Sequence, residues 1–171
     1  MIIVLNGPLG IGKSTLAEAL MESIDRCVFL DGDHLVATNP PPHDREAECL
    51  HSIISLLVAH HRRAGYQHFV INHLWRTRAE LDDLRSRLRA IDQDMEIRCF
   101  LLRLPLEENL RRVIRRERAR AVSELDFEVE ILAEELAVLD AQPEGDVGEP
   151  FDVSGAPGEL VVALKRYVGL P

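Results

Sequence analysis

The sequence predicts an α/β protein in which parallel strands alternate with helices. Short continuous apolar runs, such as IIVL at residues 2–5, recur along the chain and are typical of strands buried on both faces of a sheet. Between them lie longer stretches whose apolar residues repeat every three or four positions, as in amphipathic helices. Strands that alternate with helices in this way imply β-α-β units with right-handed crossovers.

The first half of the chain gives these elements in order. After the strand at 2–5, apolar residues at helical spacing predict a helix from Lys13 to about Ile24. Residues 27–33, CVFLDGD, indicate a second buried strand that ends in acids. The sequence NPPPH at 39–43 can continue neither a helix nor a central strand, so we expect a loop there. A longer helix should follow over about residues 44–64 and stop at a glycine.

The second half continues the alternation. Residues 68–75, HFVINHLW, predict a third strand and its exit, and a capping box of Thr77 and Glu80 should begin a helix that runs to about residue 90. Residues 96–104 predict a fourth strand, and Pro105 suits the first position of the next helix. A helix over 129–139, a short strand over 150–154 and a helix over 158–168 complete the pattern. No linker or internal repeat interrupts it, so we expect residues 1–171 to form a single domain.

Composition limits the partners of the chain. Its 171 residues carry a formal net charge of -9, which argues against a general nucleic-acid or membrane-surface binder, because such proteins present a broad basic face. The three cysteines are far apart and form no C-x-x-C pair, as is typical of buried thiols in a reducing compartment. The first residues carry no basic leader, and their apolar run is too short to span a membrane. We therefore expect a cytoplasmic protein without nucleic-acid or membrane partners, either a monomer or a homodimer.

The most specific motif follows the first strand directly. Gly7, Gly12, Lys13 and Ser14 match G-x-x-x-x-G-K-[ST], the phosphate-binding P-loop. Its glycines let backbone N–H groups turn inward around phosphate oxygens, and the next helix aims its positive end at the same anion. The lysine, one of only two in the chain, is a compact charge that can reach the β- and γ-phosphates, while the serine hydroxyl can ligate Mg²⁺. We predict that the whole stretch binds the nucleotide: Gly7, Pro8, Leu9, Gly10, Ile11, Gly12, Lys13, Ser14 and Thr15.

Two acids follow the second strand, at the edge of the sheet where open α/β folds bind ligands. In the sequence FLDGDHL, Asp33 could accept a proton or a hydrogen bond from a substrate hydroxyl, and Asp31 could hold the waters of a magnesium ion. Whether Asp33 acts as a base or belongs to the magnesium shell stays open. The alternative is an Asp-Gly turn whose carboxylates only cap backbone N–H groups.

An arginine-rich stretch, NLRRVIRRERAR, follows the fourth strand. Arg112 and Arg116 are four residues apart and therefore share one helix face. Arginines on a mobile segment can clamp a transferring phosphoryl group, and Arg116 is our choice among several for that contact. Without an anion these arginines should repel one another, so we expect a lid over about residues 112–126 that closes when ATP binds. The alternative is a solvated helix balanced by neighbouring glutamates.

Polar and aromatic residues at strand ends are candidates for the pocket of the phosphate acceptor. They are His34, Asn72, His73 and Trp75. Trp75 could offer a flat face and Asn72 a hydrogen bond, and ordinary loop packing is the alternative for each of the four. No zinc-ligand spacing is present, nor is the N/T-K-x-D sequence with which GTPases read guanine. The third and fourth strands also end without the carboxylate that motor-type ATPases usually carry there.

Together, these features resemble the small P-loop kinases of metabolites, which have the adenylate-kinase-like fold. The sequences GPLGIGKST, FLDGDHL and ILAEELAVLDAQPE are similar to segments of gluconate kinases and of their neighbours, adenylylsulfate kinase and chloramphenicol phosphotransferase. The resemblance implies a three-layer α-β-α fold with a five-stranded parallel sheet of order 2-3-1-4-5 and a helical lid. It also implies that the loop in PFDVSGAP contacts adenine, and we expect Arg112 to pack on the adenine. The Gly-His-Phe lid sequence of gluconate kinases is missing, which makes gluconate itself doubtful as the acceptor.

We therefore expect an ATP- and Mg²⁺-dependent kinase that transfers the γ-phosphoryl group to a hydroxyl of a small molecule. Lys13 would hold the phosphates, and Ser14 and Asp31 the metal. Asp33 would orient the acceptor hydroxyl, and Arg116 would close on the transferring group. A nucleotide-binding regulatory ATPase without a metabolite acceptor is the first alternative, and a nucleic-acid end kinase the second. A sugar acid, an antibiotic, a nucleoside and a shikimate-like ring all stay open as acceptors.

Overall fold

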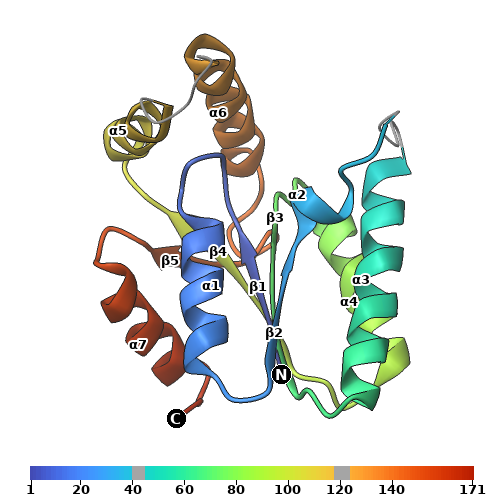
Figure 1. Cartoon of the computed structure of the whole chain (residues 1–171). Coiled ribbons are helices and arrows are strands. Elements are labelled where there is room, and N and C mark those ends of the chain that lie inside the picture. The colour runs from blue at the N-terminus through green and yellow to red at the C-terminus, as the bar shows by residue number, and fades with distance from the viewer. Residues whose placement is uncertain (40–44, 118–123) are drawn as a thin grey trace.

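The computed structural model describes residues 1–39, 45–117 and 124–171 and confirms the predicted α/β class. Its centre is a five-stranded sheet of parallel strands in the order β2-β3-β1-β4-β5 (Figure 1). The strands are β1 (Ile2–Asn6), β2 (Cys27–Asp31), β3 (His68–His73), β4 (Ile97–Arg103) and β5 (Glu149–Asp152). The strand order that the resemblance implied is therefore confirmed.

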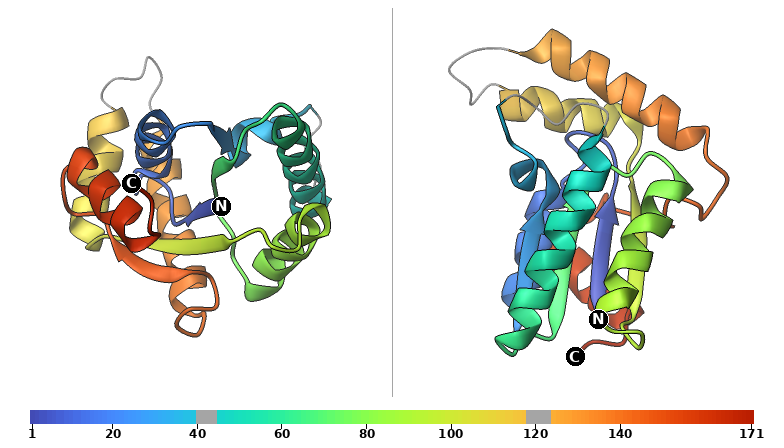
Figure 2. Two further views of the ribbon diagram at one scale, coloured as in Figure 1. Left: turned by 90° about the horizontal axis from the view of Figure 1, so that it is seen from below. Right: turned by 90° about the vertical axis from the view of Figure 1, so that its right-hand side faces the viewer.

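Helices cover both faces of the sheet and complete three layers. α3 (Glu46–Arg63) and α4 (Arg78–Ile91) lie on one face, and α1 (Lys13–Ser23) and α7 (Pro157–Tyr167) lie on the other (Figure 2). The middle strands β1 and β3 are buried on both sides, which is why they consist of continuous apolar runs. Two further helices, α5 (Leu106–Glu117) and α6 (Leu125–Asp140), lie beyond the carboxyl ends of the strands (Figure 1).

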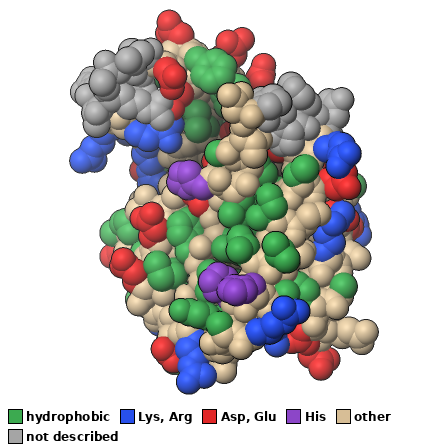
Figure 3. All heavy atoms as spheres, turned by 45° about the vertical axis from the view of Figure 1, so that its right-hand side comes forward, with side chains coloured by type: hydrophobic (Ala, Val, Ile, Leu, Met, Phe, Trp, Pro, Cys, Tyr) green, Lys and Arg blue, Asp and Glu red, His purple; other side chains and the backbone are tan. Residues whose placement is uncertain are grey.

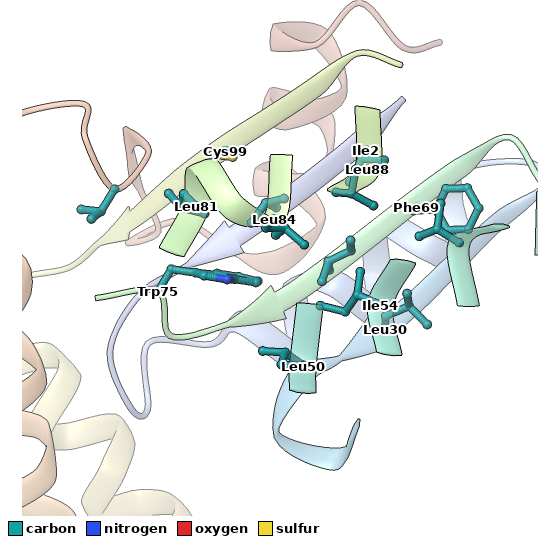
Figure 4. Packing of buried hydrophobic residues seen from close by; sticks show 14 of the residues in the cluster. Ile2, Leu30, Leu50, Ile54, Phe69, Trp75, Leu81, Leu84, Leu88 and Cys99 are labelled. Atoms are coloured by element: carbon teal, nitrogen blue, oxygen red, sulfur yellow. The ribbon is translucent and has the colours of Figure 1, made fainter. Parts of the chain in front are cut away.

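Packing on the α3–α4 face fixes where these strand ends lie. Leu50 and Ile54 of α3 and Leu81, Leu84 and Leu88 of α4 are fully buried against the sheet (Figure 4). Their spacing of three and four residues is the amphipathic pattern of the sequence. Burial of each such side chain contributes about 1.5–3 kcal/mol, so the helices hold the sheet firmly. The capping box of Thr77 and Glu80 at the start of α4 is confirmed.

The second strand ends at Asp31 and not at residue 33. Residues Gly32–Leu35 form the short helix α2, and the Asp31 side chain caps it by accepting a hydrogen bond from the backbone N–H of Asp33 at 3.1 Å. The Asp-Gly turn that the sequence left as an alternative is thus present in part. It turns the chain so that Asp33 leaves the line of the strand.

Other boundaries shift by smaller amounts. Pro105 lies before α5 instead of inside it, and its carbonyl accepts hydrogen bonds from the first turn of that helix. α6 begins at Leu125, earlier than the predicted residue 129, and β5 covers Glu149–Asp152 where 150–154 was expected. The third strand ends at His73, so Trp75 lies in the following loop.

Parts of two predictions lie outside the described residues. They are most of the loop at 39–43 and, within the lid at 112–126, residues 118–123. In residues 1–39, 45–117 and 124–171, no helix is both long and apolar enough to cross a membrane.

Candidate active site

The P-loop connects the end of β1 to the start of α1 and takes a conformation that glycine permits. Gly10 has φ 74°, and a Cβ there would lie 2.4 Å from the Val113 side chain of α5, which is too close for any other residue. Gly12, with φ 103°, is the N-cap residue of α1. The first N–H groups of α1 have no acceptor within their own helix, and they begin at Lys13. Loop and helix therefore present N–H donors of the kind that bind phosphate.

Lys13 folds back over this loop. Its Nζ donates hydrogen bonds to the carbonyls of Gly7 at 2.7 Å and Pro8 at 3.1 Å. Burial lowers the pKa of the ammonium group, and the nearby carboxylates of Asp33, Glu135 and Asp31 oppose this effect. A buried ammonium without a bound anion is costly, so the surroundings favour an anionic ligand at this point.

Ser14, Asp31 and Asn72 form a polar cluster beside the loop. The register of the sheet pairs Asp31 with Asn72, which brings their side chains together. The Ser14 hydroxyl donates to Asp31 Oδ2 at 3.0 Å, and Asn72 Nδ2 donates to both Ser14 Oγ at 2.9 Å and Asp31 Oδ2 at 3.2 Å. Asn72 Oδ1 is buried and has no hydrogen-bond partner among the described residues. A hydroxyl, a carboxylate and an unused amide oxygen fit Mg²⁺ and its waters, because this ion takes oxygen ligands.

Asn72 thus lies with the predicted metal residues and is not part of an open acceptor pocket. The residue is only 2% exposed, so a substrate-sized molecule could not reach its amide directly. This corrects the acceptor-binding role that the sequence suggested for it. The correction follows from the position of Asn72 in β3, where its amide donates to Ser14 of the helix after the P-loop.

Asp33 and His73 form a second pair at the same edge of the sheet. His73 Nδ1 lies 2.8 Å from Asp33 Oδ1, and the Asp33 side chain is 73% exposed. This hydrogen bond is the main cause that holds the pKa of Asp33 below its ordinary value, so the group is a carboxylate at neutral pH. Gly32 makes the approach possible, because a Cβ there would lie 2.7 Å from His73 Cβ and 2.8 Å from the Asn72 carbonyl. The central glycine of Asp-Gly-Asp is therefore required by packing.

The two other acceptor candidates have different surroundings. His34 is open to solvent, with its side chain 87% exposed and Nδ1 3.8 Å from Asp31 Oδ1. Trp75 is only 1% exposed, and its indole N–H donates to Nε2 of the buried His51 at 3.0 Å. The ring is therefore a core side chain and not the open flat face that the sequence suggested, although Trp75 still borders a small cavity next to His73 (Figure 4). A tryptophan ring, which is apolar with one N–H donor, is suited both to a substrate pocket and to the core. The sequence alone does not show that His51 supplies its hydrogen-bond acceptor.

Asn6 is a site residue that the sequence analysis missed. It is fully buried at the end of β1 and uses its whole amide. Oδ1 accepts from the N–H groups of Gly7 at 2.8 Å and Trp75 at 2.9 Å, while Nδ2 donates to the carbonyls of Trp75 at 2.8 Å and Val147 at 2.9 Å. It therefore ties the first residue of the P-loop to two loops distant in sequence. The signal was a polar residue closing the apolar run IIVL, directly before the first glycine.

Arg112 borders a cavity on the other side of the P-loop. Its Nη1 donates to the Ile11 carbonyl at 3.0 Å and its Nη2 to the Val153 carbonyl at 2.9 Å. The cavity has a volume of about 300 Å³ and lies between the P-loop, Thr15 and the loop after β5. This is the region where the resemblance implied adenine contact.

The sequence led us to expect that the arginines above the sheet edge lack acidic partners. At least one of them has such a partner. Arg116 Nη2 donates to Glu128 Oε1 of α6 at 2.6 Å, so its charge is balanced within the protein. Basic side chains lie beside the undescribed residues at the upper left of Figure 3. Arg118 and Arg120 lie outside the described residues. Arg116 therefore has an acidic partner, as in the alternative of a helix balanced by glutamates, but this acid comes from the next helix.

Comparisons with known proteins agree with this architecture. Residues 2–141 match the model of a family described as AAA domain. A sugar kinase from Janibacter sp. HTCC2649 superimposes with a TM-score of 0.74 at 19% identity, covering 99% of this chain and 94% of that one. The tunicamycin resistance protein of Deinococcus radiodurans gives 0.69 at 19% identity, with 99% and 96% covered. A gluconokinase from Sinorhizobium meliloti 1021 gives 0.66 at 20%, with 98% and 94% covered. No curated protein matches the sequence.

Proposed function

The chain belongs to the AAA domain family, and from that premise we propose that it is a small-molecule kinase, which transfers the γ-phosphoryl group of ATP to a hydroxyl. One observation carries the proposal. A P-loop lysine, an oxygen-rich cluster suited to Mg²⁺ and an exposed carboxylate oriented by a histidine meet at one edge of the sheet. The kinase names of two structural neighbours support the same class of reaction, although their likeness establishes the fold alone.

Each part of the site has a task in this reaction. Lys13 and the N–H groups of the loop bind the β- and γ-phosphates, and Arg112 borders the adenine cavity. Ser14, Asp31 and Asn72 would hold Mg²⁺, which neutralises phosphate charge when bound. The transition state is loose, so the protein acts mainly by positioning groups and stabilising charge.

Asp33 deals with the acceptor. Its carboxylate accepts a hydrogen bond from the acceptor hydroxyl and points the oxygen at the γ-phosphorus, while His73 keeps the carboxylate ionised and oriented. The new P–O bond forms as the bond to ADP breaks, and the hydroxyl proton leaves toward Asp33. A lowered pKa makes the Asp33 carboxylate a weaker base. Its main contribution is therefore to orient the hydroxyl and not to take its proton.

The acceptor itself would enter a cavity next to His73. This cavity has a volume of about 190 Å³ and lies between the start of α3 and the loop after β3. Glu46, Arg76 and Glu80 give it a polar lining. Its small volume favours a compact acceptor, since pockets for drug-sized ligands measure roughly 300–1,000 Å³.

A coupled ADP-release assay tests the proposal. The purified protein, ATP and Mg²⁺ are incubated with a panel of sugars, sugar acids, nucleosides and hydroxyl-bearing antibiotics, with water as the blank. A hit must release ADP in proportion to phosphorylated product seen by mass spectrometry, and Lys13→Ala must remove the signal. ADP release that no acceptor increases would instead favour the regulatory ATPase, and release that requires nucleic-acid ends would favour the end kinase.

A further inference from the structure

One face of α6 turns toward the nucleotide side of the molecule. Glu128, Leu132, Glu135 and Leu139 follow one another at spacings of four, three and four residues and therefore share that face. The two leucines are buried at 0% and 1% exposure and pack the helix down. The two glutamates are consequently held at fixed positions next to the P-loop and α5.

Both carboxylates contact groups that bind anions. Glu135 Oε2 accepts a hydrogen bond from the backbone N–H of Leu9, inside the P-loop, at 2.6 Å. Glu128 Oε1 accepts from Arg116 at 2.6 Å, and the Glu128 side chain is only 7% exposed. Such short distances are typical of hydrogen bonds to ionised groups. α6 thus supplies negative charge to the loop and to the arginine.

We propose that Glu135 and Glu128 form a carboxylate latch, in which α6 occupies two anion-binding groups that the phosphates of ATP also require. The proposal rests on the proposed function for the claim that the P-loop and Arg116 bind phosphates. A phosphate oxygen can take the Leu9 N–H only after the Glu135 carboxylate has left it, because one N–H group makes one strong hydrogen bond. Nucleotide binding is therefore a competition with an internal anion, and it releases α6 from the P-loop.

The surroundings of Lys13 support this competition. Burial is the main influence on the Lys13 ammonium and lowers its pKa, while Glu135 is one of the carboxylates that raise it. Glu135 therefore neutralises part of the charge that a phosphate would otherwise meet. Arg116 lowers the pKa of Lys13, because it is a like charge nearby.

The test is to remove the charge of Glu135 without removing its shape. Glu135→Gln removes the negative charge but keeps the size of the side chain and an oxygen that can accept from Leu9. Glu134 lies on the exposed side of the same helix, and Glu134→Gln is the matched control for net charge. Calorimetric titrations with inorganic triphosphate and with ATP would be compared among wild type and both variants, with adenosine as a ligand that has no phosphate.

We expect Glu135→Gln to bind triphosphate and ATP about tenfold more tightly, the change that corresponds to ~1.4 kcal/mol. Glu134→Gln should match wild type, and adenosine should bind all three proteins equally. Thermal unfolding checks that the variant folds, and Glu135→Ala should change affinity in the same direction. Equal affinity of wild type and Glu135→Gln for triphosphate would overturn the latch while leaving the kinase assignment in place. Failure of every protein to bind triphosphate and ATP would overturn both.

Discussion

The edge of the sheet and the helical arm above it balance their polar groups in different ways. At the sheet edge, strand register brings Asp31 beside Asn72, and the amide oxygen of Asn72 is buried without a hydrogen-bond partner among the described residues. In the region formed by α5 and α6, two glutamates of α6 are already hydrogen-bonded, one to Arg116 and one to the backbone N–H of Leu9 in the P-loop below. The first region is organised by the fold and is ready for a ligand. The second is organised by ion pairs and hydrogen bonds that a competing anion can replace.

The largest effect should come from the P-loop lysine. Lys13→Ala removes the charge nearest the phosphates, and we expect phosphoryl transfer to fall by more than about 10³-fold, the upper range for a single stabilising group. The melting temperature should not fall, since a buried charge is lost. Lys165→Ala, which removes the only other lysine, should leave the rate unchanged. A normal rate in Lys13→Ala would show that the loop does not serve phosphoryl transfer.

Asp33→Asn separates orienting the acceptor from holding the metal. We expect the rate to fall by about 10²-fold with little change in ATP affinity, because the Asp33 carboxylate bonds to His73 and only the backbone N–H of Asp33 reaches Asp31. Asp25→Asn, at a side chain that is 98% exposed, is the control. Equal losses of ATP affinity and rate would assign Asp33 to the magnesium shell.

Arg116→Ala tests the arm and should have a smaller effect. We expect a rate loss on the order of 10²-fold or less, since only one of the groups on the transferring phosphoryl is removed. The sequence alone would predict unchanged stability, but the Glu128 pair should make the variant less stable by about 1 kcal/mol. Arg111→Ala removes an exposed arginine of the same helix and should change neither quantity. Full activity in Arg116→Ala would reduce its pair with Glu128 to a structural role.

The smallest effect is a displaced pH profile. The hydrogen bond from His73 is the main cause that lowers the pKa of Asp33 below 3.8, so wild type should keep its activity as the pH falls toward about 4. His73→Ala removes that donor, and the pKa of Asp33 rises. Activity should then be lost at a higher pH than in wild type. Rates measured across the acidic range check this, and a wild-type profile in the variant would separate His73 from the function of Asp33.

The sequence predicted the fold and the position of the P-loop between the first strand and the first helix because both depend on short-range patterns. A P-loop is one local motif, and buried strands and helix faces repeat within a few residues. The missed features depend on partners that are distant along the chain. Asn6 hydrogen-bonds to Val147 across 141 positions, and the loop residue Trp75 finds its acceptor in His51 of α3. Sequence gives the donors and acceptors of a side chain but not which partner the packing brings to it.

The four hydrogen bonds of Asn6 also affect the chemical ageing of the protein. Asn6 is followed by Gly7, and in a flexible chain the glycine nitrogen readily attacks such an amide, which turns the asparagine into an acid and releases ammonia. Here that nitrogen donates to the asparagine oxygen, and the amide cannot rotate without losing its contacts to Trp75 and Val147. An aspartate would direct an oxygen at two carbonyls. Each unfolding event therefore exposes the start of the P-loop to irreversible damage, and a ligand that keeps the chain folded prolongs the working life of the protein.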